Sequence, residues 1–315
     1  MTMKPTTFLN LFAFAIFAVM LVAPSGAQAQ PIFTNALSSG VNEVSASGTV
    51  SPFTTVTGAS SLTGFTFDSH GNLFLVATSV VSSNIVRTIE EVTPNGTVSP
   101  FATVPSNNDP VDLAFDGSGN LYAADSVNHQ IIQIASNGTV TPYATLPNGT
   151  LNATTLAFDS AGNLFIGDSA EVGQNIVGQI SEVGPGGGAA SVIATLASLP
   201  GDLAFNSAGD LFVSNGTGPN SIVSEITPSG PTTYATFAAG TNPAGIAFGA
   251  DGTLYVAGVN ELYDVAPGGG AGDPLVRIIS VSSIAIDAVP EPSTWAMMLG
   301  GLGLLAFWRL RARRA

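Results

Sequence analysis

The sequence predicts an all-β fold: a six-bladed β-propeller with four strands in each blade and a ring closed by strands from both ends of the chain. Three observations in the 315 residues predict it. A motif of two short strands joined by a turn recurs at nearly regular intervals. A second hairpin follows most copies of this motif. The first and last pieces of the repeat are complementary parts of one blade.

The recurring motif is clearest between Pro110 and Asp125, which read Pro-Val-Asp-Leu-Ala-Phe-Asp-Gly-Ser-Gly-Asn-Leu-Tyr-Ala-Ala-Asp. Alternating apolar residues predict a strand, Asp-x-x-Gly-Asn predicts a tight turn, and the following Leu-Tyr-Ala-Ala predicts a second strand. The aligned turn positions are residues 68, 116, 159, 206, 249 and 287, at separations of 48, 43, 47, 43 and 38 residues. A repeat of about 40 to 50 residues with strand-forming composition is typical of propeller blades.

The second hairpin completes each blade. Ile89-Glu-Glu-Val92 leads through Thr93-Pro-Asn-Gly96 into a strand that ends at Val104, and the segment from Ile131 to Leu146 repeats this pattern. Asn-Gly between alternating segments favours a hairpin, because both residues accept positive φ. Two hairpins give four strands per repeat, as a propeller blade requires.

The two ends of the repeat predict how the ring closes. Val41–Val56 matches Ile89–Val104 at ten of sixteen positions, so it is the outer half of a blade. Ile284-Ala-Ile-Asp287 repeats only the opening strand. Joined, these pieces make one blade, and five complete copies bring the total to six. A closed ring also protects strand edges that an open array would expose.

The first 29 residues are typical of a signal peptide. Lys4 precedes an apolar stretch from Phe8 to Val22, and Ala27-Gln28-Ala29 forms an A-x-A cleavage pattern. An N-terminal transmembrane helix is the alternative, but the apolar core is short and a cleavage site follows it. We therefore expect export through the inner membrane, cleavage by signal peptidase, and a mature protein that starts near Gln30.

Residues 289–315 combine three features in a fixed order. A tripeptide, Pro290-Glu291-Pro292, precedes an apolar segment of 14 residues from Trp295 to Trp308. The chain then ends in an arginine cluster formed by Arg309, Arg311, Arg313 and Arg314. This order resembles the PEP-CTERM sorting tail of exported bacterial proteins. The resemblance implies recognition and processing by an exosortase-type membrane enzyme and delivery to the cell envelope, the cell surface or an extracellular matrix.

A permanent C-terminal anchor is the alternative reading of this tail. A membrane-spanning helix usually needs about 20 apolar residues, so a temporary anchor suits the short segment better. The arginines would hold the C-terminus on the cytoplasmic side. We expect two short hydrophobic targeting helices, one at each end, to flank the propeller.

The body of the chain, residues 30–288, resembles NHL-type repeats. The resemblance covers residues 41–287 and rests on the core apolar-Asp-x-x-Gly-Asn-apolar-Tyr-Val-Ala-Asp. NHL repeats usually continue with an Asn-x-Arg-Ile step, whereas this chain has Asn128-His129-Gln130-Ile131. The body holds 20 acidic residues against Arg87 and Arg277, a formal net charge of −18. Nucleic-acid binding is therefore not expected, because phosphate contacts depend on Lys and Arg.

Acidic and amide residues recur at the ends of the first two predicted strands of several blades. We expect five of them to surround one mouth of the central channel: Asp112, Asp125, Asp168, Asp202 and Asn215. Carboxylate and amide oxygens are the ligands that calcium prefers. Six-bladed lactonase-like and gluconolactonase-like enzymes, which this architecture resembles, hold calcium at such a mouth. The alternative is structural, since an Asp that ends a strand commonly accepts hydrogen bonds from turn backbone.

Two function classes follow from the sequence. The first is a non-enzymatic propeller that acts as a binding or scaffold module in the envelope or matrix, with a polysaccharide or an envelope protein as ligand. The second is a calcium-dependent hydrolase or lactonase that uses the acidic mouth. The chain has two histidines, His70 and His129, which lie in unrelated positions of their repeats. No Ser-His-Asp order is evident.

Overall fold

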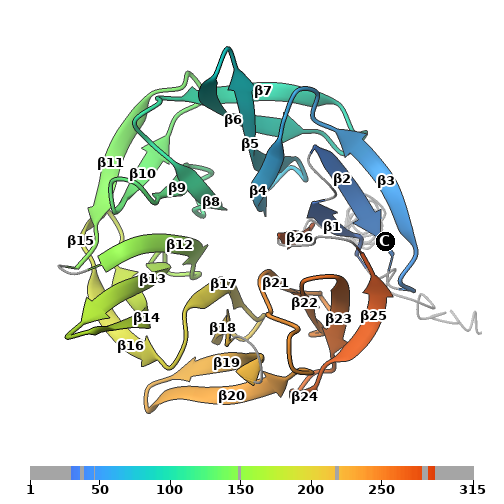
Figure 1. Ribbon diagram of the computed structural model, residues 1–315, viewed down its shortest axis with the longest axis vertical. Helices are drawn as coiled ribbons and strands as arrows, with labels where there is room; N and C mark the ends of the chain where they lie inside the picture. Colours follow the sequence, from blue (N-terminus) through green and yellow to red (C-terminus); the bar gives the residue numbers. More distant parts are fainter. Residues whose placement is uncertain are drawn as a thin grey trace, which may run out of the picture.

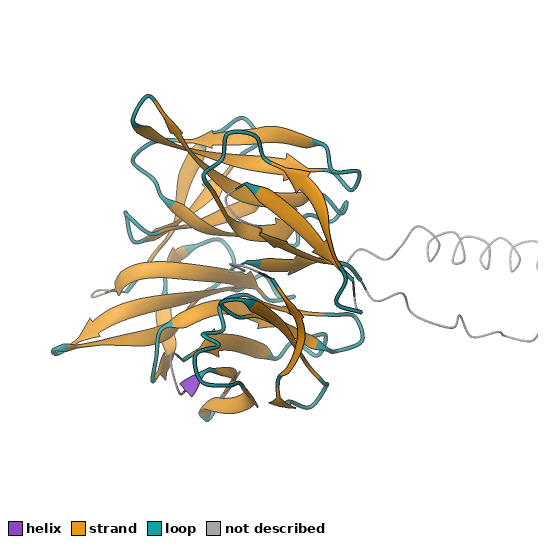
Figure 2. Ribbon diagram, turned by 45° about the vertical axis from the view of Figure 1, so that its right-hand side comes forward, coloured by secondary structure: helices purple, strands orange, loops and turns teal. Residues whose placement is uncertain are grey.

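Six β-sheets stand around a central axis like the blades of a propeller (Figure 1). The computed structural model describes residues 30–287, except 36–38, 46, 148–149, 217–219 and 279–282. Each sheet contains one complete four-stranded blade, so the predicted fold class is confirmed. Figure 2 shows that strands make up nearly all of the regular structure. Both targeting segments predicted from the sequence lie outside the described residues.

In each blade the first strand lies at the channel and the fourth lies at the outside of the ring. Blade 1 contains β26 (Ile284–Ile286), β1 (Ile32–Asn35), β2 (Gly40–Val44) and β3 (Val50–Thr55). Blade 2 contains β4 (Ser61–Phe67), β5 (Leu73–Val81), β6 (Asn84–Val92) and β7 (Val98–Val104). Blade 3 contains β8 (Pro110–Phe115), β9 (Leu121–Asp125), β10 (Gln130–Ile134) and β11 (Val140–Thr145).

The second half of the ring follows the same order. Blade 4 contains β12 (Thr150–Phe158), β13 (Leu164–Val172), β14 (Asn175–Val183) and β16 (Ser191–Leu196). Blade 5 contains β17 (Pro200–Phe205), β18 (Leu211–Asn215), β19 (Ile222–Thr227) and β20 (Gly230–Thr236). Blade 6 contains β21 (Ile246–Phe248), β22 (Leu254–Ala257), β23 (Glu261–Val265) and β25 (Asp273–Arg277).

Blade 1 closes the ring with strands from both ends of the chain, as predicted. The inner strand β26 pairs with β1 in antiparallel register, with Phe33 opposite Ala285. The side-chain amide of Gln30 also donates a hydrogen bond to the main-chain oxygen of Asp287. The chain thus enters and leaves the propeller at neighbouring points.

The Asp-x-x-Gly-Asn turns between the first and second strands have one hydrogen-bonding scheme. In blade 3, Oδ1 of Asp116 accepts the backbone N–H groups of Ser118 and Asn120 at 2.9 and 2.8 Å. The Asn120 side chain donates to the other carboxylate oxygen at 2.8 Å. Gly119 has a φ of +81°, which favours glycine. The recurrence of these residues therefore follows from turn geometry, and the same scheme holds at Asp68 and Asp159.

Aromatic contacts between neighbouring blades form much of the core. Phe74 of blade 2 packs edge-on against Phe115 of blade 3, with ring centroids 4.9 Å apart. Phe212 of blade 5 packs against Phe248 of blade 6 at the same separation of 4.9 Å. The first strands of blades 2 to 6 thus end in a half-buried phenylalanine that packs against an aromatic ring of the preceding blade: Phe67, Phe115, Phe158, Phe205 and Phe248.

Candidate functional site

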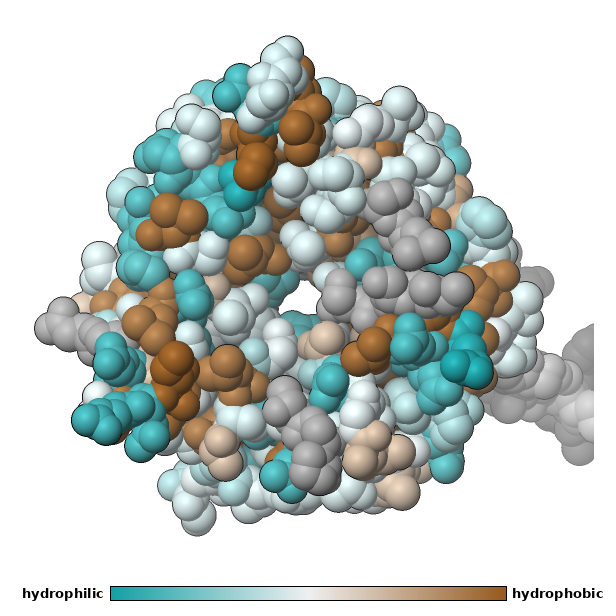
Figure 3. Space-filling model, viewed as in Figure 1, coloured by the Kyte–Doolittle hydropathy of each residue, from teal (hydrophilic) through white to brown (hydrophobic). Residues whose placement is uncertain are grey.

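The first strands of the six blades surround a central cavity of about 950 Å³. Figure 3 shows an opening at the centre of the ring. The charged side chains that line the cavity are all aspartates: Asp68, Asp112, Asp116, Asp159 and Asp202. Among the described residues, the lining contains no Lys, Arg or His, so the channel attracts cations and polar groups that donate hydrogen bonds.

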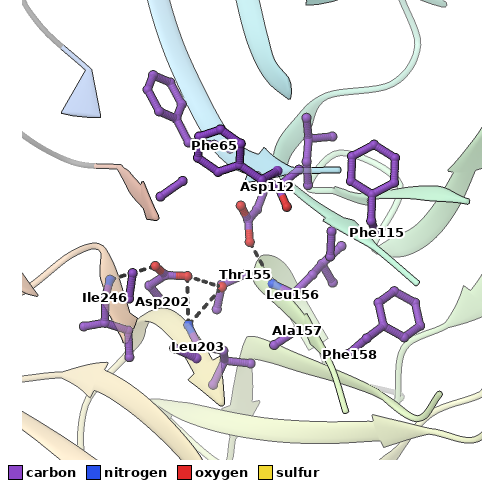
Figure 4. Close-up of a pocket in the computed structure, with 18 of the residues that line it drawn as sticks. Phe65, Asp112, Phe115, Thr155, Leu156, Ala157, Phe158, Asp202, Leu203 and Ile246 are labelled. Atoms are coloured by element: carbon purple, nitrogen blue, oxygen red, sulfur yellow. Dashed lines mark hydrogen bonds between the residues drawn. The ribbon is translucent and has the colours of Figure 1, made fainter. Parts of the chain in front are cut away.

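Two of these aspartates hold neighbouring blades together (Figure 4). Asp112 lies on β8 of blade 3, and its Oδ2 accepts the backbone N–H of Leu156 on β12 at 2.8 Å. Asp202 lies on β17 of blade 5, and its Oδ2 accepts the backbone N–H of Ile246 on β21 at 2.8 Å. Each carboxylate thus accepts a hydrogen bond from a main-chain N–H group of the next blade. Without the carboxylate, this N–H group would have to donate to water.

Thr155 of blade 4 contacts Asp202 and directly precedes Leu156, whose backbone N–H donates to Asp112. The Thr155 hydroxyl donates to Oδ1 of Asp202 at 2.8 Å and accepts the backbone N–H of Leu203 at 3.2 Å. Thr155 occupies on β12 the place that Asp112 and Asp202 occupy on their own strands. A continuous set of hydrogen bonds therefore joins the first strands of blades 3, 4, 5 and 6.

The surroundings raise the pKa of both channel carboxyls. Burial raises the pKa of Asp112 to about 7, and the nearby charge of Asp202 adds to the effect, while backbone N–H groups oppose it. Burial also raises the pKa of Asp202 to about 6, against hydrogen bonds from Ile246, Thr155 and Leu203. The pair therefore holds a proton in mildly acidic solution, and it can then donate as well as accept a hydrogen bond.

The other three predicted site residues are not among those that line the cavity. Asp125 is buried and accepts from the side chains of Asn108 and Asn128, each at 2.6 Å. It also accepts from the backbone N–H of Asp109 at 2.9 Å and the side chain of Gln130 at 3.2 Å. This carboxylate therefore fixes the segment that leads into blade 3, which is the structural role the sequence left open.

Asp168 and Asn215 lie at the corresponding position in blades 4 and 5. Ser181 donates to Oδ2 of Asp168 at 2.6 Å, and Ser224 donates to Oδ1 of Asn215 at 3.1 Å. The structure thus brings Asp112 and Asp202 together and places the other three residues elsewhere. Among the described residues, no group of three or more His, Asp or Glu side chains could hold a metal ion. Asp112 and Asp202 are thus the two predicted ligands that share the cavity, and calcium usually takes six to eight oxygen ligands.

The comparisons with known proteins agree with the fold and the tail. Residues 288–314 match the PEP-CTERM protein-sorting motif, which confirms the predicted tail. This motif indicates export and sorting to the cell envelope or surface. The chain matches no curated protein. Within the described residues, no helix is long and apolar enough to cross a membrane.

Several solved propellers are similar in structure. A chain from a nidogen–laminin complex matches with a TM-score of 0.63 at 14% identity, covering 82% of this chain and 99% of that one. A gluconolactonase from Xanthomonas campestris matches with a TM-score of 0.60 at 15% identity, covering 83% and 91%. A streptogramin B lyase matches with a TM-score of 0.51 at 17% identity, covering 70% of each chain. At these identities the likeness shows the fold alone.

Proposed function

We propose that this protein is an exported, non-enzymatic β-propeller that acts as a binding or scaffold module in the cell envelope or extracellular matrix. The location is supported by the sorting motif at residues 288–314, which begins two residues after the last propeller strand ends at Ile286. One similar propeller comes from a complex between two proteins, nidogen and laminin. The ligand we propose is a matrix polysaccharide or an envelope protein, bound at the channel.

One observation carries the non-enzymatic proposal: the channel carboxylates are engaged by the fold. Asp112 and Asp202 each accept a backbone N–H of the next blade at 2.8 Å. The turn carboxylate of Asp116 likewise accepts two backbone N–H groups at 2.8 and 2.9 Å. These backbone contacts give the aspartates a role in joining strands, and this role supports a channel that binds a ligand without turning it over.

The cavity itself suits a polar ligand. Its volume of about 950 Å³ lies at the upper end of the range for ligand pockets, roughly 300 to 1,000 Å³. Hydroxyl-bearing threonines line it beside the carboxylates: Thr63, Thr66, Thr154 and Thr155. These groups are matched to the hydroxyls of a sugar, which donate to carboxylates and exchange hydrogen bonds with other hydroxyls.

Binding and turnover can be measured on the same preparation. We expect soluble fragments of the producing cell's exopolysaccharide, or an envelope protein, to bind the exported protein in calorimetry. We expect no hydrolysis of lactone or ester substrates. Turnover that falls at least tenfold in Asp112→Asn would contradict the proposal, and so would failure of both ligand classes to bind.

A calcium-dependent hydrolase or lactonase is the second candidate. The observation that favours it is the pair of channel carboxyls whose pKa values are raised to about 7 and about 6. A general acid or base works best when its own pKa lies near the ambient pH. The similar gluconolactonase agrees with this candidate in fold. A rate that depends on added calcium would favour the hydrolase over the binding module.

The sorting tail gives a separate prediction about location. Removal of residues 290–315 should abolish retention at the cell surface and leave the propeller folded, because all six sheets are complete by Ile286. Surface labelling and circular dichroism of the released protein check the two parts. A truncated protein that is unfolded would contradict the independence of the propeller.

A further inference from the structure

The body of the chain supplies no positive charge to the channel pair, the carboxylates of Asp112 and Asp202. Residues 30–287 contain no lysine and two arginines. Both arginines form ion pairs with acidic residues that are not among those lining the cavity: Arg87 with Asp109 at 2.6 Å and Arg277 with Glu261 at 3.5 Å. No cationic side chain among the described residues pairs with Asp112 or Asp202. A cation that neutralises the channel pair therefore comes from outside the propeller.

The channel pair is placed to share one ligand. Figure 4 shows both carboxylates near Thr155, pointing into the same part of the cavity. Both aspartates are half-buried, so they stay in contact with the cavity. Burial raises the pKa of Asp112 and the charge of Asp202 raises it further, so the two carboxylates are close enough to repel each other. A carboxylate has about four lone pairs, so each one can accept a donor beside the backbone N–H group that it already holds.

A primary ammonium group matches this pair better than a sugar hydroxyl or a metal ion. It carries a positive charge and three N–H donors, whereas a hydroxyl is uncharged and has one donor. Hydrogen bonds between two charged groups are also roughly twice as strong as those between neutral groups. Calcium takes six to eight oxygen ligands, and no group of three or more acidic or histidine side chains in the described part of the chain could hold a metal ion.

Aromatic side chains of the cavity add to the preference for a cation. The phenylalanines that end the first strands of blades 2 to 6 line the cavity, and each is half-buried: Phe67, Phe115, Phe158, Phe205 and Phe248. The face of an aromatic ring carries partial negative charge and attracts cations, and its carbon surface packs against C–H groups. Carboxylates and phenylalanines in one cavity therefore suit a ligand that is cationic and also presents C–H groups.

The cavity has a second acidic level at the other end of the first strands. Asp68, Asp116 and Asp159 lie in the turns that follow the first strands of blades 2, 3 and 4, and all three line the cavity. From Asp112 to Asp116 the chain advances four residues, which span about 13 Å in an extended strand. His70 lies 3.6 Å from Asp68, but its side chain is 81% exposed and is not among those lining the cavity. Two separated acidic levels suit a chain with repeated positive groups better than one small amine.

We propose that the channel binds a linear polysaccharide that carries free amino groups, with one ammonium group held between Asp112 and Asp202. This inference rests on the proposed function, because it names the ligand class of the same channel. The ring is open at its centre, where a chain can enter (Figure 3). The carboxylates accept from the amines, and the threonines of the lining exchange hydrogen bonds with the sugar hydroxyls. A lysine-bearing protein offers the amines without the array of hydroxyls.

Two matched oligosaccharides test the ligand class on the wild-type protein. Glucosamine oligomers and N-acetylglucosamine oligomers of the same length and linkage differ in that only the first carry ammonium groups. In calorimetry of the purified full chain near neutral pH, we expect the amino oligomer to bind at least about tenfold more tightly than the acetylated one. The difference should shrink as added salt screens the charges.

Single substitutions locate the site. Asp112→Asn and Asp202→Asn each remove one charge and keep a side-chain oxygen that can accept the backbone N–H of the next blade. Each should weaken binding of the amino oligomer about tenfold and change binding of the acetylated oligomer less than about twofold. Asp273→Asn makes the same charge change on the exposed start of β25 and should leave both affinities unchanged. Thermal unfolding checks that each variant is folded.

The outcomes separate this inference from the proposed function. Equal binding of the two oligomers, or an amine preference that Asp112→Asn and Asp202→Asn leave intact, would overturn the amine site and leave the channel a binding module. Tighter binding of oligolysine than of the amino oligomer would assign the amines to a protein and overturn the polysaccharide. Failure of both oligomers to bind would overturn the inference, and the proposed function falls with it only if an envelope protein also fails to bind. The oligomer comparison on wild type decides even if a variant is unfolded.

Discussion

Blades 3 and 4 place an aspartate at the same position and surround it differently. Asp125 and Asp168 both lie on the second strand, opposite Gln130 and Gln179 of the third strand. Both side chains are 0% exposed. Burial alone would raise the pKa of both carboxyls, since water no longer stabilises the charge. The structure nevertheless gives them opposite shifts.

The number of donors explains the difference. Burial raises the pKa of Asp125, but hydrogen bonds from Asp109, Asn128, Asn108 and Gln130 outweigh it, and the net shift is downward. Burial raises the pKa of Asp168 to about 6, because only Ser181 donates to it. The second carboxylate oxygen of Asp168 is buried and has no hydrogen-bond partner. Whether a buried carboxylate at this position stabilises the fold thus depends on how many donors the neighbouring loops and strands supply.

The largest expected effect is the loss of Asp125. Asp125→Ala leaves four donor groups without their acceptor, so we expect the free energy of unfolding at pH 7 to fall on the order of 3 kcal/mol. Urea unfolding measures it. The deficit should shrink as pH falls below about 4, because a carboxyl with a lowered pKa contributes stability above the ordinary pKa and loses it on protonation. A deficit that is the same at pH 3 and pH 7 would contradict this account.

In blade 4 we expect the substitution of the buried aspartate to stabilise the fold. Asp168→Asn should raise the unfolding midpoint at pH 8 by roughly 2 to 4 °C, the shift that about 1 kcal/mol gives in a domain of this size. Blade 5 already has this arrangement, with Asn215 beside Ser224. Thermal unfolding checks the change, and a lower midpoint for Asp168→Asn at pH 8 would show that the charged form is stabilised.

A smaller effect, of known direction, is expected in the pH dependence of the wild-type protein's stability. Between about pH 4 and the folded pKa of about 6, the unfolded chain loses its proton at Asp168 while the folded chain keeps it, so stability falls as pH rises. The slope should be shallower in Asp168→Asn than in wild type over this interval. Equal slopes would place the titration elsewhere, with Asp112 and Asp202 as the next groups to substitute.

The smallest effect is expected in the turn of blade 5, where the residue pair is reversed. Here Asn206 accepts the turn N–H groups and donates to Asp210, both through its side-chain amide at 2.9 Å. Asn206→Asp brings two carboxylates together and should cost about 1 kcal/mol. Adding Asp210→Asn restores the pattern of the other turns and should recover the loss to within about 0.5 kcal/mol. An uncorrected loss would mean that the turn depends on blade context.

The sequence predicts the fold well because the repeat is local. Asp116, Gly119 and Asn120 recur for a reason that lies within one turn, and Leu113 and Phe115 alternate within one strand. Ring closure was also predictable, because the N-terminal outer half and the C-terminal opening strand are complementary. β1 supplies the second strand of this blade, and its Ile-Phe-Thr-Asn segment is too short for the repeat to identify.

The site was less predictable, because its contacts join separate repeats. Whether Asp125 faces donors depends on Asn108, which lies in the connection between blades 2 and 3 and has no equivalent in the repeat. The link from Asp112 to Leu156 spans 44 positions, and no local pattern contains it.

Thermal unfolding of the exported protein with calcium and with EDTA tests most directly the claim that the buried carboxylates serve the fold. A ligand that binds only the native state raises the unfolding midpoint by mass action. We expect the same midpoint in both conditions. A rise of several degrees with calcium that is lost in Asp112→Asn or Asp202→Asn would contradict it and would favour the calcium-dependent hydrolase.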